Sequence, residues 1–322
     1  MPALKGVSYT FGRLRLDNSL SSISDDTNEK YLNFKEKYSG TDFLIDDYSF
    51  SFKDEKVEDE LFDCLLKRFE KVKVCRYTSL HSLFRTINEG EQSVCCIVGM
   101  NDKSECTYAD SYIRTSNNTE SLPVKTIYDA CEENKYFILS CMDSQKYDDL
   151  TMWRLYGDNT KGVNILYEVD KNKLNKFKFY YIDYAEDAGP QGHRSLNFIR
   201  DLLNLKVGGR SFRLRTWNEW KHFFKPYEYR DEMEIRLLYN RQTNPAGKWI
   251  LTGDYSIACP LALFNLKRFP LVVDEIKLGP NCPDVVSNLL QLELLLQEKQ
   301  STIRTTKKKG IVQSSQVKTY RL

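Results

Sequence analysis

The order of strand-like and helix-like segments constrains the fold of this 322-residue chain more than any other feature. Short apolar or β-branched runs predict strands at 72–77, 94–98, 136–142, 162–169, 177–184, 232–239, 249–251 and 272–278. Apolar residues at helical spacing, with capping signals, predict helices at 57–72, 79–88, 127–134, 148–156, 196–205 and 285–299. Strands and helices mix without strict βαβ alternation. We therefore expect an α+β fold with a mixed, mainly antiparallel sheet core and flanking helices.

The chain shows no internal repeat and no clear linker after about residue 70. We therefore expect a partly helical N-terminal extension over residues 1–70 and one main α+β domain over residues 71–322. Residues 102–122 are polar, and we expect them to form a long connection within that domain.

Composition excludes several classes of protein. The 47 basic and 45 acidic residues nearly cancel, which is typical of an ordinary globular protein. No run of about 18 apolar residues is present, so we expect no transmembrane helix. The first ten residues lack the apolar stretch of a secretory signal. The nine cysteines include no CxxC pair, so we expect reduced thiols, a cytoplasmic location and no metal site.

The familiar nucleotide-binding and hydrolase motifs are missing from the sequence. There is no GxGxxG, no P-loop, no GxSxG elbow and no HExxH. These absences disfavour Rossmann dehydrogenases, NTPases, α/β-hydrolases and zincins. Any chemistry must therefore come from local clusters of side chains.

The first cluster is Arg76-Tyr77-Thr78, at the end of an expected strand and just before an expected helix. An arginine beside a helix N-terminus forms a natural anion site. A capped helix with a surface arginine explains the same residues without a ligand.

The second cluster is Trp153 and Tyr156, which are three residues apart and share a face on a helical turn. Gly157 and Gly162 bracket the polar turn that follows them. The aromatic pair could form the floor of a ring-binding pocket, or it could be a packed corner of the core.

The third cluster is Glu232, Glu234 and Arg236 in an expected strand. Alternation along a strand would place all three side chains on one face, with Met233, Ile235 and Leu237 on the other. A carboxylate pair beside an arginine in a cleft could carry acid–base chemistry. Charges on an exposed sheet face are the simpler interpretation.

Taken together, these clusters resemble the prokaryotic domain of unknown function 2971 family. The elements that carry the resemblance are Arg76-Tyr77, Asn101-Asp102, Ser140, Met152-Trp153 with Tyr156 and Gly162, the Glu232–Arg236 run, and Ile276-Lys277-Leu278-Gly279-Pro280. They keep the family's order from about residue 74 onward. Lys103 stands where the family usually has proline.

A second resemblance implies an activity. An arginine on an early strand, a serine on a middle strand and Glu-x-Glu on a late strand are similar to the layout of ADP-ribosyltransferases. Arg76, Ser140 and Glu234 occupy those places, although Leu139-Ser140-Cys141 replaces the Ser-Thr-Ser of that class. The resemblance implies an ADP-ribosyltransferase-like fold and NAD as substrate.

The roles follow from the same resemblance. Glu234 would stabilise the oxocarbenium-like ribose, and Glu232 would orient or deprotonate the acceptor. Arg76 would hold the pyrophosphate, and Tyr77, Trp153 or Tyr156 would stack on nicotinamide. The family's distribution implies a bacterial toxin or anti-phage defence setting, with a nucleic acid or a protein as acceptor and a defence-system partner protein.

Two alternatives remain open from the sequence. Arg210, Arg213, Arg215 and Lys221, interleaved with aromatic residues, could grip phosphates and stack bases in a nucleic-acid-binding protein. The chain could also be a non-catalytic sensor or scaffold of a defence system. Release of nicotinamide from NAD distinguishes the enzyme from both.

Overall fold

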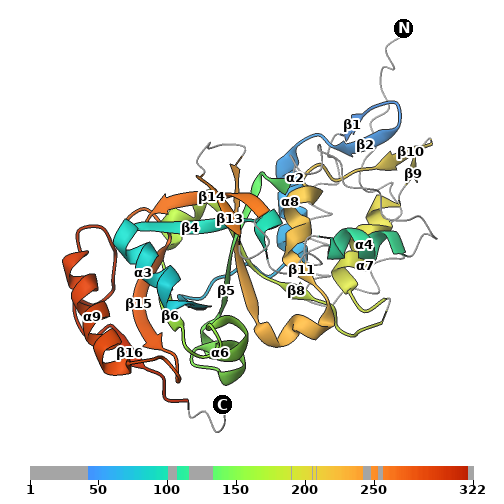
Figure 1. Cartoon of the computed structure of the whole chain (residues 1–322). Helices are drawn as coiled ribbons and strands as arrows, with labels where there is room; N and C mark the ends of the chain where they lie inside the picture. Colours follow the sequence, from blue (N-terminus) through green and yellow to red (C-terminus); the bar gives the residue numbers. More distant parts are fainter. Residues whose placement is uncertain are drawn as a thin grey trace. The chain divides into compact units, whose positions relative to one another are not determined.

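The computed structural model describes residues 43–100, 107–115, 133–189, 191–204, 206–207, 209–241, 248–252 and 257–317 (Figure 1). Over these residues the chain is a mixed α+β protein whose largest sheet is mainly antiparallel, as the sequence predicts. None of the described helices combines the length and the apolar content needed to cross a membrane.

The chain forms two compact units. Unit 1 takes its described residues from 1–68, 102–125 and 182–230, and unit 2 takes them from 69–101, 126–181 and 231–322. The first boundary lies close to the expected one at residue 70. Unit 1 nevertheless includes two later stretches that we expected in the main domain. A chain that leaves a unit and re-enters it needs no compositional linker, so the sequence carries no signal for this division.

Unit 2 is built on a ten-stranded sheet. Eight strands follow one another in the order β13 (Lys248–Thr252), β14 (Ile257–Asn265), β4 (Glu91–Cys96), β5 (Tyr136–Asp143), β3 (Lys73–Thr78), β6 (Val163–Val169), β15 (Leu271–Leu278) and β16 (Val312–Ser314). In addition, β12 (Glu234–Asn240) pairs with both β5 and β7 (Phe177–Tyr181). Among the described strands of this sheet, only β15 and β16 run parallel as neighbours.

The sheet divides beside the middle of β5. Strand β12 follows one edge of β5 along its full length. On the other edge, β4 pairs with Phe137 and Ile138, whereas β3 pairs with Met142 and Asp143. Among the described strands, therefore, none pairs with residues 139–141 on that edge. The predicted serine, Ser140, lies at this division.

Helix α3 (Leu80–Glu89) begins at its predicted cap, Ser79, and α6 (Leu150–Tyr156) begins at Asp149, inside the expected 148–156 segment. The Ser79 hydroxyl accepts from the Ser82 amide, and Gly90 ends α3 in the left-handed region at φ 68°. The Asp149 carboxylate accepts from the Met152 amide at the start of α6. Side chains that satisfy free amides at a helix start fix where it begins, so these boundaries were predictable.

The last helix, α9 (Val285–Glu298), buries a different face from the one its sequence suggests. We expected Val286, Leu290 and Leu294 to form part of its apolar face, yet all three are exposed. Leu292 and Leu296 are the buried residues. Because leucine lies on several sides of this helix, its pattern does not determine which side faces the core.

The described residues of unit 1 form two small sheets and four α-helices. The sheets follow the orders β1 (Phe43–Ile45), β2 (Ser49–Phe52), β10 (Arg210–Phe212), β9 (Lys206–Val207), and β11 (Phe224–Lys225), β8 (Asp183–Tyr184). The helices are α2 (Glu55–Leu65), α4 (Tyr108–Thr115), α7 (Arg194–Leu203) and α8 (Trp217–Trp220). Aromatic packing forms the core, with the rings of Phe62 and Trp220 stacked at 4.8 Å.

Several predicted elements differ from the observed ones. The helix expected at 57–72 ends at Leu65, because Leu66 is extended. Residues 108–115 form α4 inside the expected connection. The single strand expected at 177–184 is interrupted and forms β7 and β8. Most of the helix expected at 127–134 lies outside the described residues.

Candidate functional site

The β12–β5 ladder brings three of the predicted catalytic residues to one face of the sheet. Glu234 lies opposite Met142, and Arg236 lies opposite Ser140. Residues directly opposite each other in an antiparallel pair project to the same face. Glu234, Arg236 and Ser140 therefore share the face that also carries Met142.

Glu234 and Arg236 form a bidentate ion pair. Arg236 Nε lies 2.7 Å from Glu234 Oε1, and Arg236 Nη2 lies 3.2 Å from Oε2. The two residues are 3% and 0% exposed. Two parallel charge-assisted hydrogen bonds compensate charges that little water can reach. The pair therefore fixes the position of the carboxylate.

Glu232 does not extend this strand face, so the alternation predicted for it is wrong. It ends a 3-10 segment, Tyr227–Glu232, and β12 begins only at Glu234. Between them, Met233 has a left-handed backbone with φ 47°. The Met233 carbonyl accepts a hydrogen bond from the Asp143 amide at 3.1 Å. A single left-handed residue thus breaks a run whose composition is typical of a continuous strand.

The Glu232 carboxylate nevertheless lies next to a predicted ligand-binding residue. The Tyr156 hydroxyl donates a hydrogen bond to Glu232 Oε1. Tyr156 is the last residue of α6 and is 40% exposed. Among the three predicted stacking aromatics, it alone has a ring that is open to solvent.

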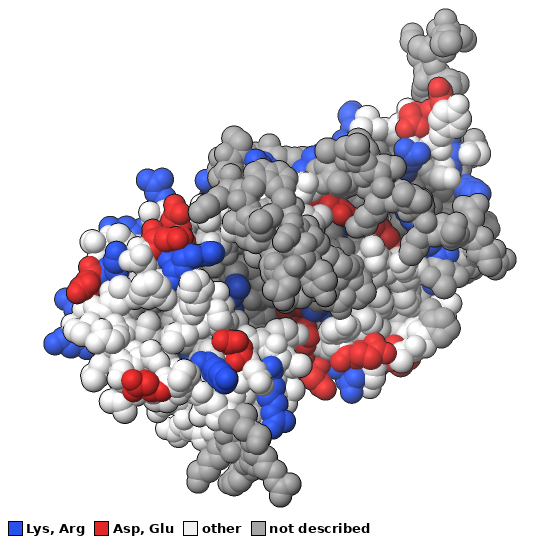
Figure 2. All heavy atoms as spheres, viewed as in Figure 1, with Lys and Arg blue, Asp and Glu red and all other residues white. Residues whose placement is uncertain are grey.

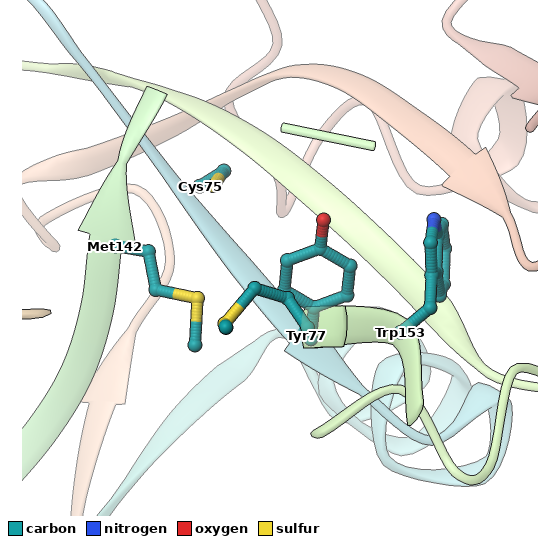
Figure 3. Packing of buried hydrophobic residues seen from close by; sticks show 5 residues of the cluster. Cys75, Tyr77, Met142 and Trp153 are labelled. Carbon is teal, nitrogen blue, oxygen red and sulfur yellow. The ribbon is translucent and has the colours of Figure 1, made fainter. Parts of the chain in front are cut away.

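Tyr77 and Trp153 are enclosed in a packed corner (Figure 3). Their rings meet edge to face at 4.9 Å, beside Cys75 and Met142. The Trp153 indole donates to Asp148 Oδ1 at 2.9 Å. With Tyr77 6% and Trp153 0% exposed, neither ring is open to stack on a planar ligand.

Arg76 faces away from the Glu234 side of the sheet. Cys75 lies opposite Met142, so alternation along β3 directs Arg76 to the other face, where Cys141 lies. Burial raises the pKa of the Cys141 thiol to about 12, and the nearby Arg76 charge opposes that rise. The structure therefore brings Ser140 and Glu234 together but does not gather Arg76 with them.

The Arg76 guanidinium has an unsatisfied atom. Its buried Nη1 makes no hydrogen bond to any residue in the described ranges. Thr78, the other polar member of the predicted anion site, ends β3 opposite Val163. Alternation along β3 places Thr78 on the same face as Arg76 and Tyr77 on the other, so the predicted anion site is reduced to Arg76 and Thr78 on the face away from Glu234.

The glycines of the family resemblance meet at one structural corner. A Cβ on Gly162 would lie 2.3 Å from the Thr78 carbonyl oxygen, and one on Gly279 would lie 2.2 Å from the Thr160 carbonyl oxygen. The Gly279 amide also donates to the Gly162 carbonyl at 2.8 Å. Close approach of backbone segments requires glycine. These motif positions therefore build the turn between α6 and β6.

Three of the four basic residues predicted to bind nucleic acid make contacts within unit 1. Arg215 Nη1 pairs with Glu55 at 3.1 Å, and its Nη2 donates to the Phe52 carbonyl at 2.8 Å. Lys221 pairs with Asp110 at 2.9 Å. The positive charges of Arg215 and Lys221 are therefore already paired within the unit.

The remaining two residues of the predicted nucleic-acid site are Arg210 and Arg213. Arg210 donates to the Asp46 carbonyl at 2.7 Å, whereas the Arg213 side chain is exposed. On the face drawn in Figure 2, the described acidic and basic residues are interspersed rather than gathered by sign. Asn101 and Asp102 lie outside the described residues.

Asp143 is a polar residue that sequence reasoning missed. It ends β5, and its Oδ2 accepts from Lys71 Nζ at 2.7 Å and from the Tyr181 hydroxyl at 3.0 Å. Burial alone would raise the pKa of Asp143, but these bonds and one from the Gln145 amide hold it below its ordinary value. Its partners come from three separate segments, so no local motif could identify it.

Over the described ranges, no group of three or more His, Cys, Asp or Glu side chains is arranged to hold a metal ion. Comparison of the chain with family models, with curated proteins and with solved structures gives no match. The candidate site therefore rests on its geometry: a buried Glu234–Arg236 pair on the Ser140 face, and a neighbouring Glu232–Tyr156 pair.

Proposed function

We propose that this chain cleaves the nicotinamide–ribose bond of NAD and transfers the ADP-ribose, with Glu232, Glu234 and Ser140 at the centre. The observation that carries the proposal is the pairing of Glu234 with Arg236 on the face of Ser140. A second carboxylate, Glu232, lies two residues away along the chain and accepts a hydrogen bond from Tyr156, which is partly exposed.

The reaction uses the two carboxylates differently. The C1′–N1 bond breaks, and its electron pair neutralises the pyridinium, so nicotinamide leaves as a neutral molecule. The ribose becomes oxocarbenium-like, as in glycoside cleavage. A carboxylate fixed in a site with little water stabilises that positive charge. A nucleophile then bonds to C1′ and gives its proton to Glu232 as general base.

The geometry narrows the roles implied by the resemblance. Because Arg76 lies on the opposite face from Glu234, the proposal does not use it to hold the pyrophosphate of the same NAD molecule. Tyr156 is the remaining aromatic that can meet the nicotinamide. Since Glu234 is 3% exposed, the residues over it must open before a ribose reaches it.

Two further parts of the proposal rest on the sequence. An ADP-ribosyltransferase-like fold fits a mainly antiparallel sheet that divides beside β5, and the resemblance motivates it. A toxin or anti-phage setting, with a protein or nucleic acid as acceptor, rests on the resemblance alone.

Release of nicotinamide from NAD by the purified full chain tests the proposal. NADH is the matched control substrate, because its dihydropyridine carries no positive charge and is a poor leaving group. Glu234→Gln tests the site, and Glu168→Gln serves as control because Glu168 is an exposed carboxylate on β6 of the same sheet.

We expect NAD but not NADH to be consumed by the wild type and by Glu168→Gln. Turnover by Glu234→Gln should fall about 100-fold or more, the scale seen when one group that stabilises developing charge is removed. Equal NAD consumption by the wild type and Glu234→Gln would assign the ion pair a purely structural role.

A further inference from the structure

Unit 1 contains a pocket that none of the candidate-site residues lines. Its volume is about 320 Å³, and it lies between α4, residues 185–189 with Gln191, and residues 226–228. This volume is at the lower end of the range for small-molecule sites. The pocket therefore suits a ligand of few atoms.

Tyrosine rings form much of the wall. Tyr108, Tyr112 and Tyr227 line the pocket, and the first two rings lie 6.0 Å apart at an angle of 53°. The Tyr112 hydroxyl donates to Asn197 Oδ1 at 3.0 Å and accepts from the His193 amide at 2.9 Å. The aromatic wall is thus held in place before any ligand arrives.

The charged residues on the wall are acidic. Asp187 and Glu228 line the pocket, both are exposed, and no lysine, arginine or histidine is found among its described lining residues. Burial raises the pKa of Tyr108, and Tyr112, Glu228 and Asp183 add to that rise in turn. The surroundings of Tyr108 therefore disfavour further negative charge.

Two basic groups near the pocket, Arg200 and Arg230, each make a contact of their own, although Arg200 Nη1 is buried and makes no hydrogen bond to a described residue. Arg200 Nη2 donates to Gln191 Oε1 at 2.8 Å, with its guanidinium 5.9 Å from the Tyr112 ring centre. Arg230 lies 3.7 Å over the Tyr227 ring. Burial lowers the pKa of His193 to about 4, so its imidazole is neutral at pH 7.

From these features we propose that the unit 1 pocket binds an organic cation, an alkylammonium or guanidinium head group on a short aliphatic stem. The tyrosine faces attract a cation through their quadrupoles. Asp187 and Glu228 supply charge-assisted acceptors for its N–H groups. The same chemistry could come from a free amine or from a lysine or arginine side chain of a polypeptide.

Calorimetric titration of the full chain with three small probes tests the charge preference. The probes are n-butylammonium, n-butylguanidinium and butyrate, which have similar stems but differ in the head group. We expect both cations to bind and butyrate not to bind. Butyrate binding as well as the cations, or no cation binding at about 50 mM, where a millimolar ligand would saturate, overturns the proposal.

Two peptides distinguish the sources of the cation. A pentapeptide with lysine between glycines is compared with one that carries norleucine in its place. Binding of the lysine peptide at least as tight as that of butylammonium identifies a polypeptide side chain as ligand. Binding of butylammonium alone identifies a free amine. Equal binding of both peptides contradicts recognition of the charge.

Substitutions of lining residues test whether the cation binds in this pocket. Glu228→Gln should weaken butylammonium binding about two- to fivefold, as expected for one partly exposed charge pair. The matched control is Asp201→Asn, which removes an exposed carboxylate from α7 in the same unit. An equal loss in both variants would mean that general charge attraction, not the pocket, holds the ligand.

The ring is tested by a pair of substitutions at one position. Tyr108→Phe keeps the aromatic face and should keep binding, whereas Tyr108→Leu should weaken it about two- to fivefold. Circular dichroism melting of each variant confirms that it is folded before titration. Equal affinity of the phenylalanine and leucine variants would exclude a cation–aromatic contact at Tyr108.

Discussion

The guanidinium of Arg236 donates two hydrogen bonds to the carboxylate of Glu234, the shorter being 2.7 Å between Nε and Oε1. The two residues are two positions apart on β12 and therefore share a face of the sheet. Both are buried. A local sequence pattern thus creates a compensated charge pair in the middle of a sheet, where an uncompensated charge would be costly.

The pair should be strongly coupled in stability. Glu234→Gln and Arg236→Gln each remove one charge of a buried pair, at a cost of about 3–5 kcal/mol. The double variant should lose less than the sum, with an interaction energy of about 0.5–3 kcal/mol. Urea unfolding of the four proteins measures the cycle. Glu168→Gln should stay within about 0.5 kcal/mol of the wild type; additive losses at 234 and 236 would contradict the coupling.

Asp143 should make the free energy of unfolding depend on pH in the acidic range. Its pKa is lowered in the folded state, so its contribution is full above the unfolded pKa near 3.8 and is lost as pH falls through the lower folded value. Asp143→Asn should destabilise by about 1.5–3 kcal/mol at pH 7, as expected for hydrogen bonds to a charged group.

The measurement for Asp143 is urea unfolding at a series of pH values from 7 downward. The difference between the wild type and Asp143→Asn should shrink below about pH 4. A difference that stays constant down to pH 2 would show that the Asp143 charge is not what stabilises β5. Glu168→Gln again provides the control curve.

Gly162 should tolerate no side chain. A Cβ there would lie 2.3 Å from the Thr78 carbonyl oxygen, whereas one on Gly209 meets no described residue within 4 Å. Gly209 has φ +80°, so Gly209→Ala should cost only about 1–2 kcal/mol of backbone strain. Thermal melts should show a larger loss for Gly162→Ala. Equal losses would mean that the corner relaxes around the added methyl group.

Arg213 and Arg215 form a matched pair for the nucleic-acid alternative. Arg215 bonds to Glu55 and to two carbonyls of unit 1, so Arg215→Ala should destabilise the protein by about 1–3 kcal/mol. Exposed Arg213→Ala should change stability by less than about 0.5 kcal/mol. Chemical unfolding compares them. An Arg215→Ala variant that keeps its stability but binds RNA more weakly than the wild type, with a flatter salt dependence, would favour the nucleic-acid hypothesis.

Local signals in the sequence predicted the elements with clear periodicity or caps. The strand over Lys73–Thr78 and the helix from Ser79 to Gly90 follow from apolar runs, one N-cap and one left-handed glycine. These features depend on nearby residues alone. The same local reasoning placed Glu234 and Arg236 on one face.

Features set by distant contacts were not predictable. The left-handed Met233 separates Glu232 from the strand, although methionine carries no signal for that conformation. The enclosure of Trp153 depends on Cys75 and Tyr77 of β3, which is remote in sequence. The division of the chain into two units depends on which segments return to each other. The sequence therefore predicted the Glu234–Arg236 pair better than the surroundings that decide its accessibility.

The kinetic behaviour of Glu234→Gln tests the central claim, that Glu234 stabilises the transition state of NAD cleavage. The measurement is kcat for nicotinamide release together with the NAD dissociation constant, both at a temperature where the variant is folded. An interaction made in the transition state should lower kcat about 100-fold or more while NAD affinity stays within about threefold. An unchanged kcat, or a loss of kcat no larger than that of Glu168→Gln, would contradict the account.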